Sequence, residues 1–303
     1  MESFLTNLKD GCRLVLQYFG IFRHPLTLEE IHLFNPVRST QEKVLAALDE
    51  LLAESIIFHS DTFYMPVKNE EWVHGRRKAN AAALKLLARS GRYASVISAC
   101  PFVRGIAISG SLSKFSVSDQ PDIDYFIITA SDRLWIARTL LHLFKKLTFL
   151  TGHQHFFCMN YFIDEKALLI THPNRYTAIE VATLLPVFNT DLLLQFYNAN
   201  GWVKEYLPNH PGLVNLDYVK NEKKQHVKKI LEGIIGFIFP DRMNLLLMRF
   251  TDRKWRRKWS RAGYPEQEYD RAFLTDLHIS KNHPVDYEKK VLASLVEHNI
   301  SGN

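Results

Sequence analysis

Residues 108–129 read ISGSLSKFSVSDQPDIDYFIIT, and no other stretch of the chain is as informative about its fold. One apolar run ends at a Gly-Ser turn (Gly110, Ser111), and a second apolar run opens at Asp122 and Asp124. Each run has the length and composition of a buried strand. Because side chains alternate along a strand, we expect the two aspartates to share one face, roughly 7 Å apart.

Two carboxylates on one face repel each other, and a divalent cation would relieve that repulsion. Mg²⁺ prefers carboxylate oxygens combined with the phosphates of a substrate. The backbone N–H groups and the hydroxyl of a Gly-Ser turn can hold a polyphosphate. Metal ligands and a phosphate site in one short unit indicate nucleotidyl transfer.

This pattern resembles the motif of the nucleotidyltransferase superfamily, whose members share the DNA polymerase β-like palm. In that motif, Asp-x-Asp follows a Gly-Ser turn by about a dozen residues, and Asp122 follows Gly110 by 12. The resemblance covers roughly residues 101–170. It implies that Asp122 and Asp124 are catalytic Mg²⁺ ligands and that Gly110 and Ser111 bind the phosphates of an NTP. Lys114 would neutralise phosphate charge as pyrophosphate leaves.

A third acidic residue usually completes the site in this superfamily. The sequence predicts a helix over 131–150, with Ser131 as its N-cap, followed by a strand that has Asn160 at its middle. Asn160 therefore stands where the resemblance places the third carboxylate. Either it works with a single nucleotide-bound Mg²⁺ while Asp164 partly compensates, or catalysis has been lost and nucleotide binding remains.

Residues 1–68 have the pattern of a winged helix: three helical segments followed by two short strands around Ser60 and Asp61. Thr27 and Glu30 form a capping-box pattern before the second helix. The exposed positions of the third helix include several acidic residues, so a structural or partner-docking role is favoured over DNA binding. Residues 69–100 are predicted to form two connecting helices with a break near Ser90–Gly91.

The C-terminal region, residues 173–303, is predicted to be helical, and the resemblance implies that such a region closes over the nucleotide. Residues 249–261 surround Trp255 and Trp259 with arginines and lysines. RNA, single-stranded nucleic acid or an anionic membrane surface would suit them, but tryptophans packed on the body of the protein are favoured. His278 and His283 are assigned no metal.

The composition is that of an ordinary globular protein: 303 residues, 47% hydrophobic, 23% charged, with a formal charge of +6. Cys12, Cys100 and Cys158 are isolated, which argues against zinc and disulfides. There is no signal-peptide pattern and no run of about 18 apolar residues, so we expect a cytoplasmic protein without a transmembrane segment.

These observations predict an α+β protein made of a winged helix (1–68), connecting helices (69–100), a small mixed-sheet nucleotidyltransferase core (101–172) and a helical region (173–303). The predicted activity is Mg²⁺-dependent transfer of an NMP from an NTP to an unidentified hydroxyl or phosphate acceptor. Nucleic acid is a less favoured candidate for the acceptor or for a partner. The alternative is a weak or inactive nucleotide-binding palm that acts as a regulator through its winged helix.

Overall fold

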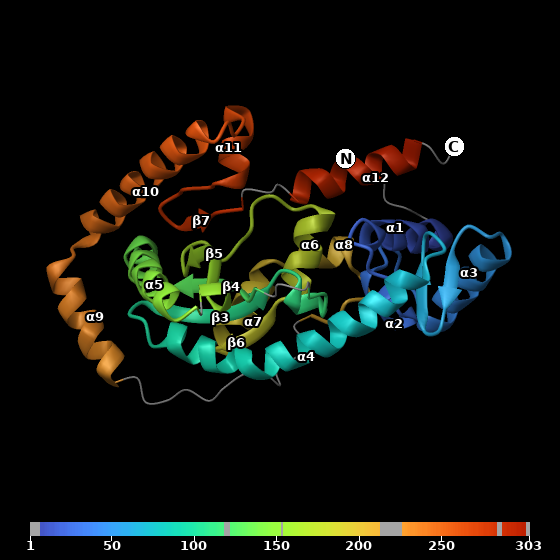
Figure 1. Cartoon of the computed structure of the whole chain (residues 1–303), viewed down its shortest axis with the longest axis horizontal. Coiled ribbons are helices and arrows are strands. Elements are labelled where there is room, and N and C mark those ends of the chain that lie inside the picture. Colours follow the sequence, from blue (N-terminus) through green and yellow to red (C-terminus); the bar gives the residue numbers. More distant parts are fainter. Residues whose placement is uncertain (1–6, 118–121, 153, 213–225, 284–286, 301–303) are drawn as a thin grey trace.

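The computed structural model describes residues 7–117, 122–152, 154–212, 226–283 and 287–300. Within these ranges the chain forms twelve α-helices, a mixed five-stranded sheet and a small hairpin near the N-terminus, so the predicted α+β class is confirmed. The molecule is elongated, with the N-terminal helices at one end, the sheet in the other half and α9 at the far edge (Figure 1).

The N-terminal unit has the predicted order of elements: α1 (Leu8–Gly20), α2 (Leu28–Phe34), α3 (Gln41–Ala53), β1 (Phe58–Ser60) and β2 (Phe63–Met65). The capping box of α2 is present: Thr27 N donates to Glu30 Oε2 at 2.9 Å, and Glu30 N donates to Thr27 Oγ1 at 3.3 Å. These two bonds satisfy donors that the start of a helix would otherwise leave unpaired. They explain why α2 begins where the sequence indicates.

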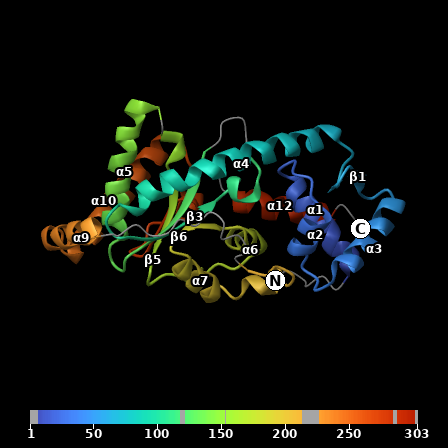
Figure 2. The same cartoon turned by 90° about the horizontal axis from the view of Figure 1, so that it is seen from below.

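A single helix, α4 (Glu70–Ser98), replaces the two connecting helices that were predicted. The break expected near Ser90–Gly91 is absent because both residues are buried within the helix. Leu87 before them and Ala94 after them pack in the same core cluster. Continuous burial of one helix face therefore outweighs the weak helix propensity of glycine. The helix runs from the N-terminal unit to the sheet (Figure 2).

The sheet has the strand order β6-β3-β4-β5-β7. Only the β4–β5 pair is parallel among these neighbours. The strands are β3 (Val103–Ser109), β4 (Asp124–Thr129), β5 (Cys158–Asp164), β6 (Leu185–Phe188) and β7 (Ile279–Lys281). Both edge strands come from residues 173–303, the region predicted to be helical, and that prediction missed them. Pro186 lies in β6, and an edge strand tolerates a proline because one side needs no hydrogen-bond donor.

Alternating side chains of the sheet enter two cores. Phe126 and Ile128 pack on one face with α6 (Arg175–Ala182), α7 (Thr190–Ala199) and α8 (Val203–Tyr206). Tyr125 and Ile127 pack on the other face with α4 and α5 (Leu134–Thr148). The first core is continuous with that of the N-terminal unit, so the start of β4 lies close to the junction of the two parts.

Helix α5 begins later than the predicted range of 131–150. Asp132 has a left-handed backbone (φ 60°), and its N–H donates to the carboxylate of Asp164 at 2.9 Å instead of starting the helix. Ser131 is therefore not the N-cap; Arg133 occupies that position without a side-chain cap. Three short 3-10 turns flank these elements: η1 (Leu112–Lys114), η2 (Phe149–Thr151) and η3 (Gln154–Phe156).

The C-terminal helices are α9 (His226–Ile238), α10 (Asp241–Arg261), α11 (Glu266–Ala272) and α12 (Tyr287–Ile300). Trp255 is buried, and the ring of Trp259 stacks on Phe273 at 4.9 Å, which confirms that both tryptophans pack on the body of the protein. Among the helices described, none has the length and apolar character needed to cross a membrane.

Candidate functional site

The Gly110 turn and the start of β4 face each other directly. Ser109 pairs with Asp124 across the antiparallel β3–β4 ladder, and Gly110 follows with a left-handed backbone (φ 67°). A Cβ at position 110 would lie 2.6 Å from Oδ2 of Asp124. Only glycine allows both this backbone conformation and this approach. The turn continues into η1, which contains Lys114, so a single 3-10 turn follows Ser111.

The two aspartates flank a buried residue. Ile123 is fully buried, and its backbone continues the pairing with β5, because Cys158 N donates to Ile123 O at 3.2 Å. Asp124 is half-buried, whereas Asp122 is exposed just ahead of the strand. Oδ1 of Asp122 lies 3.1 Å from Nδ1 of His155. Residues 118–121, which precede the pair, lie outside the described residues.

The carboxyl group of Asp124 is electrostatically strained. Burial raises its pKa above the usual value, and the negative charges of Asp122 and Glu180 act in the same direction. A hydrogen bond with Cys158 and the charge of Lys114 oppose this rise without cancelling it. Burial also raises the pKa of the Cys158 thiol to about 12, so the thiol stays protonated at neutral pH. A cation beside Asp124 would relieve the cost of its charge.

A register shift in the β4–β5 ladder directs Asn160 to this position. Asp124 pairs with Cys158 but Phe126 pairs with Tyr161, so β5 has one extra residue here. Nδ2 of Asn160 consequently lies 3.5 Å from Oδ1 of Asp124. Bulges commonly re-aim a side chain beside a functional site.

The same bulge disturbs the predicted alternation of β5. Met159 and Phe162 are buried in the same core cluster, although strict alternation would place them on opposite faces. Strict alternation along the sequence would place Asn160 on one face with Phe162 and Asp164, and the bulge separates Asn160 from Phe162. A bulge in a strand has no reliable signal in a single apolar run.

Glu180 is a residue of this site that the sequence analysis did not identify. Its Oε1 lies 2.9 Å from Nζ of Lys114, which also donates to Gly110 O at 3.0 Å. Lys114 is therefore held at the turn by two contacts, and its ammonium group has a third hydrogen for a further acceptor. Glu180 belongs to α6, so only the fold brings it close to Asp124. Cys158 also contacts the site, and its place in β5 two residues before Asn160 is a signal that the sequence offers.

The N-terminal unit borders the site. The pKa of His24 in this unit is lowered well below its usual value, first by burial and then by the charges of Arg76 and Lys114. Tyr18 of α1 is buried, and the charge of Glu180 contributes to its raised pKa. The charges of Lys114 and Glu180 therefore act on buried side chains of the N-terminal unit.

Asp164 does not compensate for Asn160, contrary to one of the hypotheses. It lies at the other end of β5, four residues from Asn160 and thus roughly 13 Å away. Its side chain is fully buried and accepts hydrogen bonds from Asp132 N (2.9 Å) and Lys166 N (2.9 Å). These bonds hold the two loops that follow β4 and β5.

A second group of potential metal ligands lies at this opposite end of the sheet. It consists of Asp132, Asp164 and His278, whose ligand atoms lie within 4.8 Å of one another and could hold a metal ion. Nδ1 of His278 lies 2.8 Å from Oδ2 of Asp164, although no metal was assigned to this histidine from the sequence. Nζ of Lys166 lies 2.6 Å from Oδ2 of Asp132, so a positive charge already sits beside these three ligands.

Two surface hollows of about 280 and 370 Å³ lie beside the N-terminal hairpin, and neither is lined by Asp122 or Asp124.

Comparisons of the chain with protein-family models, curated proteins and solved structures give no match. The geometry around Asp124 is therefore the basis for the chemistry proposed below.

Proposed function

We propose that the protein is a nucleotidyltransferase whose site consists of the Gly110 turn and the Asp122–Asp124 pair. The observation that carries this proposal is the close approach of Gly110 to the Asp124 carboxylate. A turn whose N–H groups and hydroxyl could donate hydrogen bonds to a phosphate thus lies beside a potential metal ligand. Asp124 is half-buried beside the negative charges of Asp122 and Glu180, which supports a cation at this position. The mixed sheet that carries this turn and this pair of aspartates suggests the palm of the superfamily that the sequence resembles.

Mg²⁺ suits the carboxylate oxygens of Asp122 and Asp124. Asn160 would offer its oxygen only after its amide rotates, because Nδ2 now faces Asp124. When bound, Mg²⁺ would supply positive charge that orients the triphosphate and stabilises the transition state. The backbone N–H groups and hydroxyl of Gly110 and Ser111 would bind the β- and γ-phosphates. Lys114, held at the turn beside Glu180, would add positive charge on the leaving side.

In the proposed reaction, an acceptor oxygen bonds to the α-phosphorus while the bond from that phosphorus to the bridging oxygen breaks. Pyrophosphate leaves with the electron pair, and the acceptor proton passes to water. Asn160 cannot accept this proton, because an amide has no basic site at neutral pH. The chain therefore contributes positioning and electrostatic stabilisation at this step.

A second candidate function is a nucleotide-binding regulator without transfer activity. Asn160 favours it, since the neutral amide lies where a third carboxylate would face Asp124. The order of α1 to α3 and the hairpin suggests a winged helix, which would then carry the signal to a partner. The exposed side of α3 includes Glu42, Asp49 and Glu50, which disfavours DNA as that partner.

Incubating the protein with each labelled NTP and Mg²⁺ tests the proposal through release of pyrophosphate. We expect release that Asp122→Ala and Asp124→Ala abolish, while Asp49→Ala on α3 leaves it unchanged. Magnesium-dependent nucleotide binding without pyrophosphate would support the regulator. Absence of both binding and release would contradict both functions.

A further inference from the structure

Helix α9 is attached to the sheet by its polar side chains. Lys228 is buried and donates to the carbonyl of Ser98 at 2.9 Å. Glu232 binds Arg104 with both carboxylate oxygens, at 2.7 and 3.0 Å, and accepts the N–H of Phe102 at 2.6 Å. Two charged residues of α9 thus face the protein, the reverse of an ordinary surface helix.

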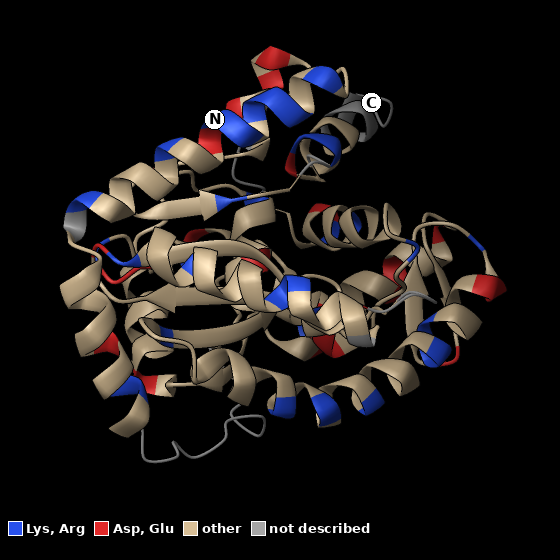
Figure 3. Ribbon diagram, turned by 60° about the vertical axis from the view of Figure 1, so that its left-hand side comes forward, with Lys and Arg blue, Asp and Glu red and all other residues tan. Residues whose placement is uncertain are grey.

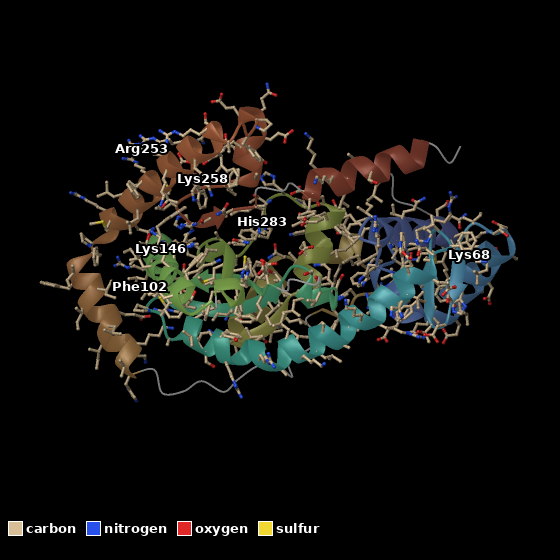
Figure 4. All side chains as sticks on the ribbon, viewed as in Figure 1. Lys68, Phe102, Lys146, Arg253, Lys258 and His283 are labelled. Atoms are coloured by element: carbon tan, nitrogen blue, oxygen red, sulfur yellow. The ribbon has the colours of Figure 1, made fainter. Side chains whose placement is uncertain are left out.

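The apolar side chains of α9 mostly face away from the protein. Five of them are 51% to 91% exposed: Val227, Ile230, Ile234, Phe237 and Ile238. Val227, Ile230 and Ile234 are three or four residues apart, and Phe237 and Ile238 lie three and four residues beyond Ile234, so the five form one stripe. Ile235 of α9 and Phe239, just after the helix, pack inward against the cluster that contains Phe102, which is labelled in Figure 4. A continuous apolar stripe of this length in water indicates that another surface covers it.

Helix α10 extends this surface with positive charge. Its outward positions begin with Leu246 and Phe250, which are more than half exposed, and continue with arginines at helical spacing: Arg249, Arg253, Arg257 and Arg261. None of these four guanidinium groups forms an ion pair within the described ranges. Figure 3 shows the positive charges along α10 beside the largely uncharged α9.

We propose that the outward faces of α9 and α10 together bind an anionic phospholipid surface. The apolar stripe of α9 would enter the boundary between headgroups and acyl chains, and the arginines of α10 would contact lipid phosphates. A second copy of the chain would bring the same unpaired cations, whereas lipid headgroups bring the complementary charge. Single-stranded nucleic acid would stack its bases on aromatic rings, but Trp255 and Trp259 beside the arginines are turned inward onto Phe273. The exposed rings of Phe237 and Phe250 lie among aliphatic side chains, which suit acyl chains better than bases.

Sedimentation of the full-length protein with lipid vesicles tests this assignment. We expect binding to vesicles of phosphatidylcholine mixed with phosphatidylserine and none to phosphatidylcholine alone. The double variant Arg253→Glu/Arg257→Glu should weaken binding by about 30-fold or more, the factor for two surface cations. Ile234→Ser/Phe237→Ser should weaken it by at least about tenfold through the loss of apolar insertion.

Matched controls come from exposed positions of α4. Leu84→Ser, at a residue that is 57% exposed, repeats the apolar change, and Lys85→Glu/Arg89→Glu repeats the charge change. Both should bind vesicles like the wild type, and thermal melts should show all four variants folded. Equal loss in the controls, or no binding to anionic vesicles, would overturn the proposal. So would binding of a labelled RNA oligonucleotide but not vesicles, or a dimer that Ile234→Ser/Phe237→Ser dissociates without any vesicle binding.

Discussion

The carboxylate of Asp124 faces the backbone of Gly110 so closely that a Cβ at position 110 would lie 2.6 Å from Oδ2. We expect Gly110→Ala to lower the free energy of unfolding by about 1–2 kcal/mol, because alanine disfavours the left-handed backbone that this turn requires. The added methyl group must also displace the carboxylate, so the variant should lose magnesium-dependent stabilisation. Urea unfolding with and without Mg²⁺ measures both effects.

Gly75 in α4 provides the control for this substitution. A Cβ there would meet no heavy atom within 4 Å, and the residue is inside a helix. Gly75→Ala should therefore raise the free energy of unfolding by roughly 0.5–1 kcal/mol. Similar responses at the two positions would show that the turn imposes no special constraint.

The second prediction concerns the pH dependence that Asp124 contributes. Its pKa is raised in the folded protein, first by burial, so the folded state holds this proton more tightly than the unfolded chain does. The wild type should lose stability as pH rises from the usual value of 3.8 through the raised pKa. Asp124→Asn carries no such charge. It should therefore be more stable than the wild type at pH values above the raised pKa, and should have no such advantage below pH 3.8.

Unfolding free energies of wild type and Asp124→Asn across this pH range, without divalent metal, test the prediction. Mg²⁺ should then restore the wild type above the window and leave Asp124→Asn unchanged. Asp122→Asn is the control for a general charge effect, since Asp122 is exposed. A difference between wild type and Asp124→Asn that does not vary with pH would count against a strained carboxylate.

The third prediction concerns Asp164, whose buried carboxylate joins two loops. Asp164→Ala would leave the N–H groups of Asp132 and Lys166 without their acceptor. Each hydrogen bond to a charged group contributes about 1.5–3 kcal/mol, so we expect a loss of about 3 kcal/mol or more. Denaturant unfolding measures it, and the exposed Asp49→Ala should change stability by less than about 0.5 kcal/mol. Equal effects would remove the structural role assigned to Asp164.

The fourth prediction concerns the attachment of α9. Burial alone would raise the pKa of Glu232, but the hydrogen bonds from Arg104 and from Phe102 N–H more than offset this and lower it. The stabilisation is therefore complete above the usual pKa of 4.5 and is lost as pH falls through the lowered value. Glu232→Gln should cost roughly 1.5–3 kcal/mol, the value for hydrogen bonds to a charged group.

Hydrogen exchange of α9 amides reports this loss directly. We expect faster exchange in α9 of Glu232→Gln at neutral pH, and in the wild type when the pH is lowered. Glu71→Gln, at an exposed position of α4, should leave α9 unchanged. Unaltered protection of α9 in Glu232→Gln would show that other contacts hold the helix.

Local patterns in the sequence predicted much of this fold. Capping at Thr27 and apolar periodicity identified the three N-terminal helices, and the two apolar runs around Gly110 identified β3 and β4. The errors lie where tertiary packing overrides local preference. Ser90–Gly91 continues a helix because the sheet buries it, and Pro186 enters a strand because that strand is an edge.

The candidate site was predictable only in part for a related reason. Gly110 directly follows β3 and Asp124 begins the adjacent strand β4, so their spacing along the chain indicates their proximity. Glu180 reaches the turn from α6, and Asn160 reaches Asp124 through a bulge. Neither contact has a local sequence signal, because each depends on how distant segments pack.

The fifth prediction concerns Asn160, whose Nδ2 lies 3.5 Å from Oδ1 of Asp124. Asn160→Asp would replace this donor by a carboxylate next to one that already carries a strained charge. Without a cation the repulsion should cost about 1–4 kcal/mol, the range for two unit charges 4 Å apart between bulk water and a protein surface. Mg²⁺ should recover this loss, because the site then has three carboxylates with Asp122.

The melting temperature should therefore rise more steeply with increasing Mg²⁺ for Asn160→Asp than for the wild type. Asn160→Ser, which adds no charge, should show no such gain. If the transferase proposal is correct, pyrophosphate release should also increase in Asn160→Asp, whereas an Mg²⁺ response equal to that of the wild type would mean that position 160 does not face the metal site.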